Sequence, residues 1–313
     1  MRTIDLHCDT VSALLDGTHT GSLMMSSGQV DIEKLRAGGV GVQFFACYFD
    51  KTDVLSPYAK AKEMIAFATR EIEAASADIL LARSVSDIRV AEETGKIATF
   101  LTIEEGGALE GDMTHLSEFY GDGVRLMTLT WNYPNEIGYP NIGYRDSDKG
   151  LSPFGREVVL EMERMGMIVD VSHLSDRGFY DVAELMTRPF VASHSNARSI
   201  TDHPRNLTDD MIRRIALAGG VIGLNFANLF LGNSPISLVS DMVRHVQHIY
   251  QVGGAEVLAL GTDFDGIDPA VEIQDASKLS ILWEALHKAG MRMSDIEKMQ
   301  YQNARRVLAD CLK

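Results

Sequence analysis

A chain of 313 residues is longer than most single domains, although α/β barrels of this length commonly fold as one domain. Hydrophobic residues make up 45% of the sequence and charged residues 23%, which provides for a large buried core and excludes a disordered chain. The formal net charge of -15 argues against nucleic acid and anionic membranes as partners, because both would repel the protein at long range.

The three cysteines, Cys8, Cys47 and Cys311, are widely separated and form no CxxC pair. This spacing argues against a disulfide framework and against a thiolate zinc site. The first residues lack a basic segment followed by an apolar stretch of signal-peptide length, and no run approaches the roughly 20 apolar residues of a membrane span. We therefore expect a soluble cytoplasmic protein with one domain over residues 1–313.

Short apolar runs rich in β-branched residues alternate with longer amphipathic stretches, a pattern typical of βαβ units. The runs lie near residues 3–6, 40–46, 97–103, 123–129, 167–171, 190–192, 221–224 and 257–261. Helices are expected between them at residues 57–75, 153–165, 176–186, 209–218 and 236–252. Capping residues such as Ser152 and glycines such as Gly166 mark their starts and ends. Eight strands predict a closed (β/α)8 TIM barrel.

Loops are predicted at residues 17–28 and 131–150, after the first and fourth strands. In a barrel both would lie at the carboxyl ends of the strands, where catalysis occurs, and we expect them to cover the substrate.

The first predicted strand ends in His7-Cys8-Asp9. Because strand side chains alternate, His7 and Asp9 project from the same face and can reach one cation. The pair alone is weak support for a metal site, since most such pairs are surface or hydrogen-bonded residues.

The third predicted strand leads into Glu104 and Glu105. Two adjacent carboxylates after a buried strand require a reason, because an ionised group there is costly unless it is paired or bound to a metal. A solvated strand end is the alternative for this feature taken alone.

The fifth and sixth predicted strands end close to His173 and His194. A single histidine in such a place is more often structural, but two on neighbouring strands converge in space. Together with His7, Asp9 and a glutamate they make three imidazoles and two carboxylates, a set that suits two borderline cations such as zinc.

Two further residues fit the needs of a hydrolase. Arg205 lies in the loop after the sixth strand, where its guanidinium can bind a carboxylate in bidentate fashion. Asp263 follows the last strand, where a general acid or base would face the metals. An aspartate turn is the alternative for Asp263.

Six segments resemble the membrane dipeptidase (renal dipeptidase) family, peptidase family M19: DLHCD, TIEEGG, DVSHLS, SHSNAR, HPRN and GTDFDG, in this order over almost the whole chain. The resemblance implies a soluble, bacterial-type member of the amidohydrolase-like metal-dependent hydrolases. It further implies a zinc dipeptidase that cleaves L,L and also L-Xaa-D-Xaa dipeptides, and that forms a homodimer.

The resemblance also implies five metal ligands for two zinc ions: His7, Asp9 and Glu104 for one ion, and Glu104, His173 and His194 for the other. It makes Arg205 the residue that binds the substrate carboxylate and Asp263 the proton-transfer residue. Glu104 matches the family's strand-terminal glutamate, although the glycines that follow could favour Glu105 as the bridging ligand.

The sequence departs from the mammalian enzymes after the fourth strand. A substrate-binding histidine follows Thr-Leu-Thr in those enzymes, whereas Trp131 and Asn132 stand here. An indole donates one hydrogen bond and cannot become a cation, so the substrate range and pH profile of the mammalian enzymes do not transfer. Phe230 falls near a family tyrosine that contacts substrate. We expect Trp131 and Asn132 to bind the substrate.

The hypothesis is hydrolysis of a dipeptide by a metal-bridging hydroxide, with Asp263 transferring the proton. One alternative is a related barrel hydrolase that acts on a lactone or a non-peptide amide. Such barrels often bridge their metals with a lysine, which the third strand end lacks. A catalytically silent barrel that binds peptides is a second alternative, although every expected ligand type is present.

Overall fold

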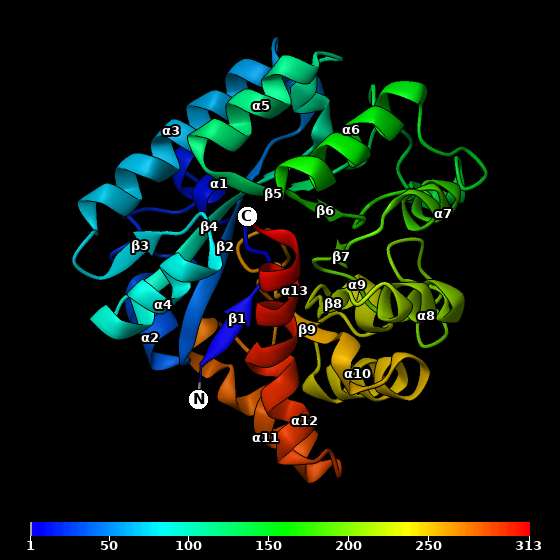
Figure 1. Ribbon diagram of the computed structural model, residues 1–313. Helices are drawn as coiled ribbons and strands as arrows, with labels where there is room; N and C mark the ends of the chain where they lie inside the picture. Colours follow the sequence, from blue (N-terminus) through cyan, green and yellow to red (C-terminus); the bar gives the residue numbers. More distant parts are fainter. Residues whose placement is uncertain (1) are drawn as a thin grey trace.

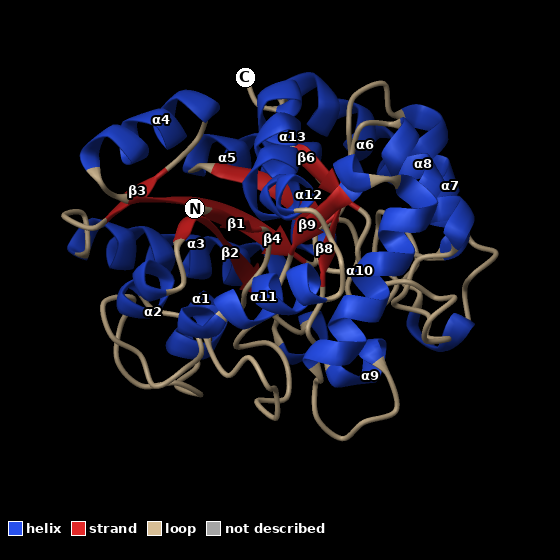
Figure 2. Ribbon diagram, turned by 90° about the horizontal axis from the view of Figure 1, so that it is seen from below, coloured by secondary structure: helices blue, strands red, loops and turns tan. Residues whose placement is uncertain are grey.

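Eight parallel strands close into a barrel in the computed structural model, which describes residues 2–313. The barrel strands are β1 (Thr3–Asp5), β2 (Val40–Tyr48), β4 (Ile97–Glu104), β5 (Val124–Thr128), β6 (Ile168–Asp170), β7 (Val191–Ala192), β8 (Val221–Leu224) and β9 (Leu258–Leu260). The β2–β4 and β1–β9 pairings complete the ring. Helices surround the strands in both ribbon views (Figures 1 and 2). The predicted (β/α)8 barrel is therefore confirmed.

One short strand, β3 (Ile79–Leu81), was not expected. It pairs with residues 97–99 of β4, whereas β5 pairs with residues 101–104 of the same strand. β3 therefore extends the sheet beside the start of β4 and is not one of the strands that close the barrel. Three residues are too few to produce a recognisable alternation of apolar and polar side chains.

The five predicted helices are present, with ends shifted by three residues or fewer: α3 (Pro57–Ala74), α6 (Pro153–Met165), α7 (Asp176–Leu185), α8 (Asp209–Leu217) and α10 (Val239–Gly253). At α6 the Ser152 side chain accepts from the Gly155 amide, and Gly166 ends the helix with a φ of 86°. α10 begins later than expected because Ser237 bridges to Val271 and its amide donates to Ala270.

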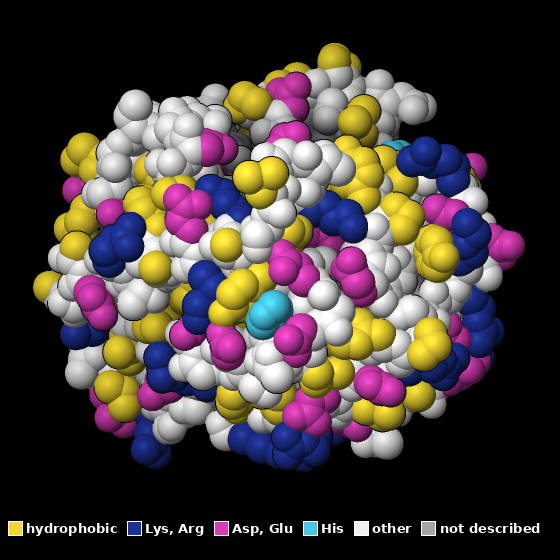
Figure 3. Space-filling view, turned by 90° about the horizontal axis from the view of Figure 1, so that it is seen from above, with side chains coloured by type: hydrophobic (Ala, Val, Ile, Leu, Met, Phe, Trp, Pro, Cys, Tyr) yellow, Lys and Arg dark blue, Asp and Glu magenta, His cyan; other side chains and the backbone are white. Residues whose placement is uncertain are grey.

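Further helices complete the outer layer and the lower end of the barrel: α1 (Thr10–Leu15), α2 (Ile32–Ala37), α4 (Val85–Thr94), α5 (Met113–Asp122), α9 (Asn228–Leu231), α11 (Ser280–Lys288), α12 (Met293–Glu297) and α13 (Asn303–Cys311). Among residues 2–313, no helix combines the length and the apolar composition needed to cross a bilayer. Acidic and basic side chains are interspersed on the face shown in Figure 3.

Apolar side chains fill the barrel interior towards the amino-terminal ends of the strands. Phe44 on β2 and Phe100 on β4 stack there with ring centres 4.8 Å apart. Val307 and Leu308 of α13 belong to the same buried cluster, so the last helix closes this end of the barrel (Figure 1). A second, larger cluster lies between the strands and the surrounding helices. Buried polar side chains instead gather at the opposite end, where the strands have their carboxyl ends.

Candidate active site

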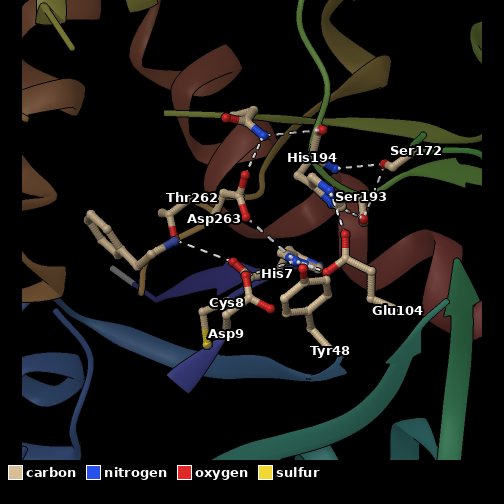
Figure 4. A network of polar contacts seen from close by, with 12 residues as sticks. His7, Cys8, Asp9, Tyr48, Glu104, Ser172, Ser193, His194, Thr262 and Asp263 are labelled. Carbon is tan, nitrogen blue, oxygen red and sulfur yellow. Dashed lines mark hydrogen bonds and ion pairs between the residues drawn. The ribbon is translucent and has the colours of Figure 1, made fainter. Parts of the chain in front are cut away.

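Residues from five strand ends meet at the carboxyl-terminal mouth of the barrel. His7 and Asp9 follow β1, Glu104 is the last residue of β4, His173 and His194 follow β6 and β7, and Asp263 follows β9. Parallel strands in a closed barrel direct all these ends to one face. Figure 4 shows the His7, Glu104 and Asp263 side chains pointing toward one another.

The Glu104 carboxylate lies between three imidazoles. Its Oε2 is 3.1 Å from His7 Nε2, and its Oε1 is 3.0 Å from His173 Nε2 and 3.4 Å from His194 Nε2. Asp9 Oδ2 lies 3.5 Å from His7 Nε2. The two oxygens of Glu104 therefore face two different sets of nitrogen atoms.

This cluster offers several three-residue groups whose donor atoms lie within 4.8 Å of one another: His7, Asp9 and Glu104; Glu104, His173 and His194; and His7, His194 and Asp263. Both ring nitrogens of His7 and Asp9 Oδ1 are buried and make no hydrogen bond. Buried polar atoms are normally satisfied, and imidazole and carboxylate together suit borderline divalent cations. The residues present thus fit a metal centre.

Glu105 lies outside this cluster. Successive strand side chains point in opposite directions, and Glu105 has a left-handed φ of 117°. Its Oε1 accepts hydrogen bonds of 2.6 Å from the Gly107 amide and from Asn135 Nδ2. The side chain therefore supports the turn after β4 and the loop that begins at residue 131.

The imidazoles differ in their affinity for protons. Burial lowers the pKa of His7, but the carboxylates of Glu104 and Asp9 outweigh it and raise that pKa well above the usual 6.5. Burial lowers the pKa of His173 to about 3, with Arg205 adding to the effect. Burial and the charge on His7 also lower the pKa of His194. The His7 side of the cluster therefore favours the protonated imidazole, whereas the side formed by His173 and His194 favours the neutral imidazole.

Burial and neighbouring charges also shift the pKa values of the two carboxyl groups, Asp9 and Glu104. Burial raises the pKa of Asp9 to about 8, and the negative charges of Glu104 and Asp263 act in the same direction. Burial also disfavours the charged form of Glu104, but His7 and the other two imidazoles outweigh it and hold its pKa well below the usual 4.5. Perturbed groups of this kind concentrate at functional sites.

Asp263 faces the cluster from a strained turn. Its φ is 63°, and its Oδ1 lies 3.7 Å from His7 Nε2. Asn225, which follows β8, donates a 2.8 Å hydrogen bond from Nδ2 to Asp263 Oδ2. A side chain at Gly266 would place its Cβ 2.0 Å from Asp9 Oδ2, so the close approach of this turn requires glycine.

Arg205 is buried beside the same mouth. Its Nη2 donates to the His194 carbonyl at 3.1 Å, and its Cζ lies 5.2 Å from the centre of the Phe230 ring. Its Nε is buried without a partner. This guanidinium borders the cavity and can receive an anionic group.

A cavity of about 660 Å³ opens above the cluster. Trp131 and Asn132 line it, as do Ile142 and Gly143 from the same loop. Tyr48 packs against Trp131 with ring centres 4.9 Å apart and forms an aromatic wall. This arrangement agrees with the expectation that residues 131–150 cover the substrate site.

Residues 17–28 do not line this cavity, so our expectation for the first loop was wrong. His19 instead lies 3.2 Å from Asp265 Oδ1, and the Gln29 amide donates to the same oxygen at 2.5 Å. These contacts hold the loop against the turn after β9 and away from the cavity.

Several residues of the site were not singled out from the sequence. Tyr48 ends β2, two residues beyond the predicted strand, and a longer strand prediction would have brought it to the same mouth. Asn225 directly follows β8, where a polar residue after an apolar run was the available signal. Asp170 and Ser193 lie behind His194, and their contacts across two strands leave no trace in local sequence.

Comparison with known proteins agrees with the geometry. Residues 1–312 match the family model described as membrane dipeptidase, peptidase family M19. An uncharacterized dipeptidase of Schizosaccharomyces pombe, C965.12, is 32% identical over 298 residues, which cover 90% of this chain and 72% of that protein.

Two solved structures share the whole fold. The dipeptidase AC, a metallo peptidase of family M19, is 26% identical, with a TM-score of 0.92 and coverage of 100% of this chain and 99% of that one. A metallo peptidase from Rhodobacter sphaeroides, liganded with a phosphinate mimic of L-Ala-D-Ala, is 25% identical, with a TM-score of 0.92 and 99% coverage of both chains. The chain therefore belongs to the membrane dipeptidase family, peptidase family M19, and is a metallodipeptidase.

Proposed function

We propose that this metallodipeptidase holds two zinc ions at the barrel mouth: one between His7, Asp9 and Glu104, the other between Glu104, His173 and His194. The observation that carries the proposal is the position of Glu104. One of its oxygens faces His7 and the other faces His173 and His194, as a bridging carboxylate requires. The same observation supports Glu104 over Glu105 as the bridging ligand.

When bound, two such ions would supply Lewis acidity and would make a metal-bridging water acidic enough to act as a hydroxide nucleophile near neutral pH. Asp263 takes a proton from the nucleophile on its Oδ1 side and delivers it to the leaving amine. Asn225 holds the other oxygen of Asp263, which keeps Oδ1 directed at the cluster.

Arg205 binds the C-terminal carboxylate of the substrate. It is the buried guanidinium beside the cluster, and its position at the cavity wall supports this role. Trp131 and Asn132 also line the cavity and contact the substrate, with the indole supplying one N–H donor and a flat apolar surface. A small substrate such as a dipeptide, bound through its C-terminal carboxylate, fits the cavity of about 660 Å³ beside the cluster.

The substrates we propose are L,L dipeptides and dipeptides with a D-residue at the C-terminus. The Rhodobacter sphaeroides peptidase, which shares the fold at a TM-score of 0.92, binds a mimic of L-Ala-D-Ala. We further propose one catalytic domain over residues 1–313 and assembly as a homodimer. The free, buried thiols of Cys8, Cys47 and Cys311 support a cytoplasmic location, where thiols stay reduced.

The decisive experiment combines metal analysis with a kinetic screen. Purified protein is stripped with a chelator, reconstituted with zinc and other divalent ions one at a time, and assayed on a library of L,L and L,D dipeptides, with lactones and non-peptide amides alongside. We expect two zinc ions per chain and dipeptide hydrolysis that disappears on stripping and returns with zinc. Hydrolysis that persists in the stripped protein, or preferential turnover of a lactone, would refute the proposal.

A further inference from the structure

A chain of hydrogen bonds runs from His194 into the barrel, through Ser193 to Asp170. Ser193 Oγ lies 2.7 Å from His194 Nδ1 and 2.5 Å from Asp170 Oδ2. All three side chains are buried, and neither Ser193 nor Asp170 lines the substrate cavity. Figure 4 shows Ser193 in contact with the His194 ring. These two residues have no role in the mechanism proposed above.

The Asp170 carboxylate is fully occupied as an acceptor. Its Oδ1 accepts from the amides of Ser172, at 3.0 Å, and Ser193, at 2.8 Å. Its Oδ2 accepts from Thr128 Oγ1, at 2.7 Å, and from Ser193 Oγ. Amides can only donate, and the two hydroxyls complete the four bonds that a carboxylate can accept. Asp170 therefore draws the hydroxyl proton of Ser193 towards itself.

A serine hydroxyl has a single proton, so the direction of the next bond is fixed. Because Ser193 donates to Asp170, its Oγ can only accept from His194, and the proton between them belongs to His194 Nδ1. Ser172 Oγ lies 3.3 Å from Ser193 Oγ and can donate into the remaining lone pair. Every proton in the network is then assigned without conflict.

We propose that Asp170 and Ser193 are positioning residues that hold neutral His194 in the tautomer with its proton on Nδ1. The Nε2 lone pair then faces His173 Nε2 at 3.1 Å and Glu104 Oε1 at 3.4 Å, ready for a cation before any cation arrives. Hydrogen bonds to the distal nitrogen orient metal-binding histidines in this way. The functional part of this inference rests on the proposed role of His194 as a metal ligand.

The tautomer can be observed directly in the metal-free protein. Two-bond proton–nitrogen NMR correlations distinguish the two neutral tautomers of a histidine labelled with ¹⁵N, and a His194→Gln variant assigns the signal among the nine histidines. We expect the Nδ1–H pattern for His194 in the wild-type protein. The Nε2–H pattern in the wild-type protein would overturn the proposal without any variant being needed.

Variants test whether Ser193 determines the tautomer of His194. Ser193→Ala should leave His194 as a mixture of tautomers and weaken metal binding about 10- to 100-fold in competition with a chelator. Ser193→Thr keeps the hydroxyl and should restore both properties. Ser172→Ala is the matched control, because Ser172 Oγ contacts Ser193 Oγ and the His194 backbone amide but not the His194 ring. The bonds from His194 to Ser193 and from Ser193 to Asp170 remain in this variant, so neither the tautomer nor the affinity should change.

The outcomes separate this inference from the proposed function. An unchanged tautomer in a folded Ser193→Ala protein contradicts the positioning role even if the enzyme hydrolyses dipeptides. An Nδ1–H tautomer in a protein that fails to bind zinc contradicts the proposed metal centre but leaves the hydrogen-bond assignment intact. If Ser193→Ala does not fold, the wild-type spectrum and Ser193→Thr still decide the tautomer.

Discussion

The two halves of the proposed ligand cluster are built differently. In the half that follows β1, His7 has no hydrogen-bond partner on either ring nitrogen and is surrounded by carboxylates. In the half that follows β6 and β7, His194 bonds to Ser193, and His173 Nδ1 lies 3.3 Å from Asn132 Oδ1. The His7 and His194 rings nevertheless stack with centres 3.8 Å apart. One half is oriented by side-chain hydrogen bonds and the other by packing and charge.

The difference has a consequence for protons. The carboxylates around His7 hold a proton on its ring, and that proton must leave before a cation can bind there. His173 and His194 have lowered pKa values and present unprotonated nitrogens near neutral pH. The two halves therefore differ in the protons that they hold.

Removing the shared carboxylate should have the largest effect, because Glu104 contacts both halves. Glu104→Gln is expected to abolish dipeptide turnover and to lower the metal content of both halves, since the neutral amide cannot bridge two cations. Metal content per chain and kcat measure the result. Glu105→Gln is the matched control, a neighbouring carboxylate outside the cluster, and it should retain its metals. The opposite ranking of the two variants would reassign the bridging ligand.

Asp263→Asn should separate chemistry from metal binding. The amide keeps the shape of the side chain but cannot take up a proton, so kcat should fall on the order of 10²- to 10⁴-fold. Metal content should stay at the wild-type level, which metal analysis of the same sample checks. Wild-type turnover in this variant would remove Asp263 from the mechanism, and loss of metal would make it a ligand of the β1 half.

Acidification should act on the two halves in opposite directions. The pKa of His173 is lowered to about 3 in the folded state, so the unfolded state binds its proton more readily and stability is lost as the pH falls from 6.5 towards 3. The pKa of His7 is raised, so its contribution is present below pH 6.5 and is lost as the pH rises through that raised value.

The measurement is urea unfolding of metal-free protein across this pH range. Relative to wild type, His173→Gln should lose less stability on acidification, by up to about 1.4 kcal/mol per pH unit for one proton. His7→Gln should differ from wild type most below pH 6.5. Parallel curves for the wild type and both variants would contradict the charge asymmetry.

Asp265 should produce the smallest of these effects. Its buried carboxylate accepts from Thr10 Oγ1 at 2.7 Å and from the Gln29 amide, and so fastens the turn that carries Asp263 to the segment after β1. Asp265→Ala should cost about 1–3 kcal/mol in the free energy of unfolding, because buried donors lose their acceptor. Urea unfolding measures this loss, and Asp265→Asn should recover part of it. No loss of stability would show that the turn is held by its backbone bonds alone.

Much of this arrangement could be predicted from the sequence. The eight barrel strands were recognisable because short apolar runs alternate with amphipathic stretches, and parallel strands bring their carboxyl ends together. That reasoning placed His7, His173 and His194 at one mouth. It also placed Asp263 there, because the residue follows the last run.

The remainder depends on atoms that sequence periodicity does not describe. Glu104 and Glu105 are adjacent and chemically alike, and only the left-handed backbone at Glu105 sends that side chain to Asn135. The Asp170–Ser193 network depends on distances between neighbouring strands. The path of residues 17–28 is set by a distant aspartate, Asp265, and not by the loop's own composition.

The barrel closes between β1 and β9, and α13 covers its amino-terminal end. The proposed metal centre therefore depends on segments that are synthesised last. His7, Asp9, Glu104, His173 and His194 all emerge within the first two-thirds of the chain. The strand that completes the ring begins only at Leu258, and the helix that fills the base ends at Cys311. A nascent or shortened chain can therefore possess every proposed ligand and still lack the closed barrel that brings them together.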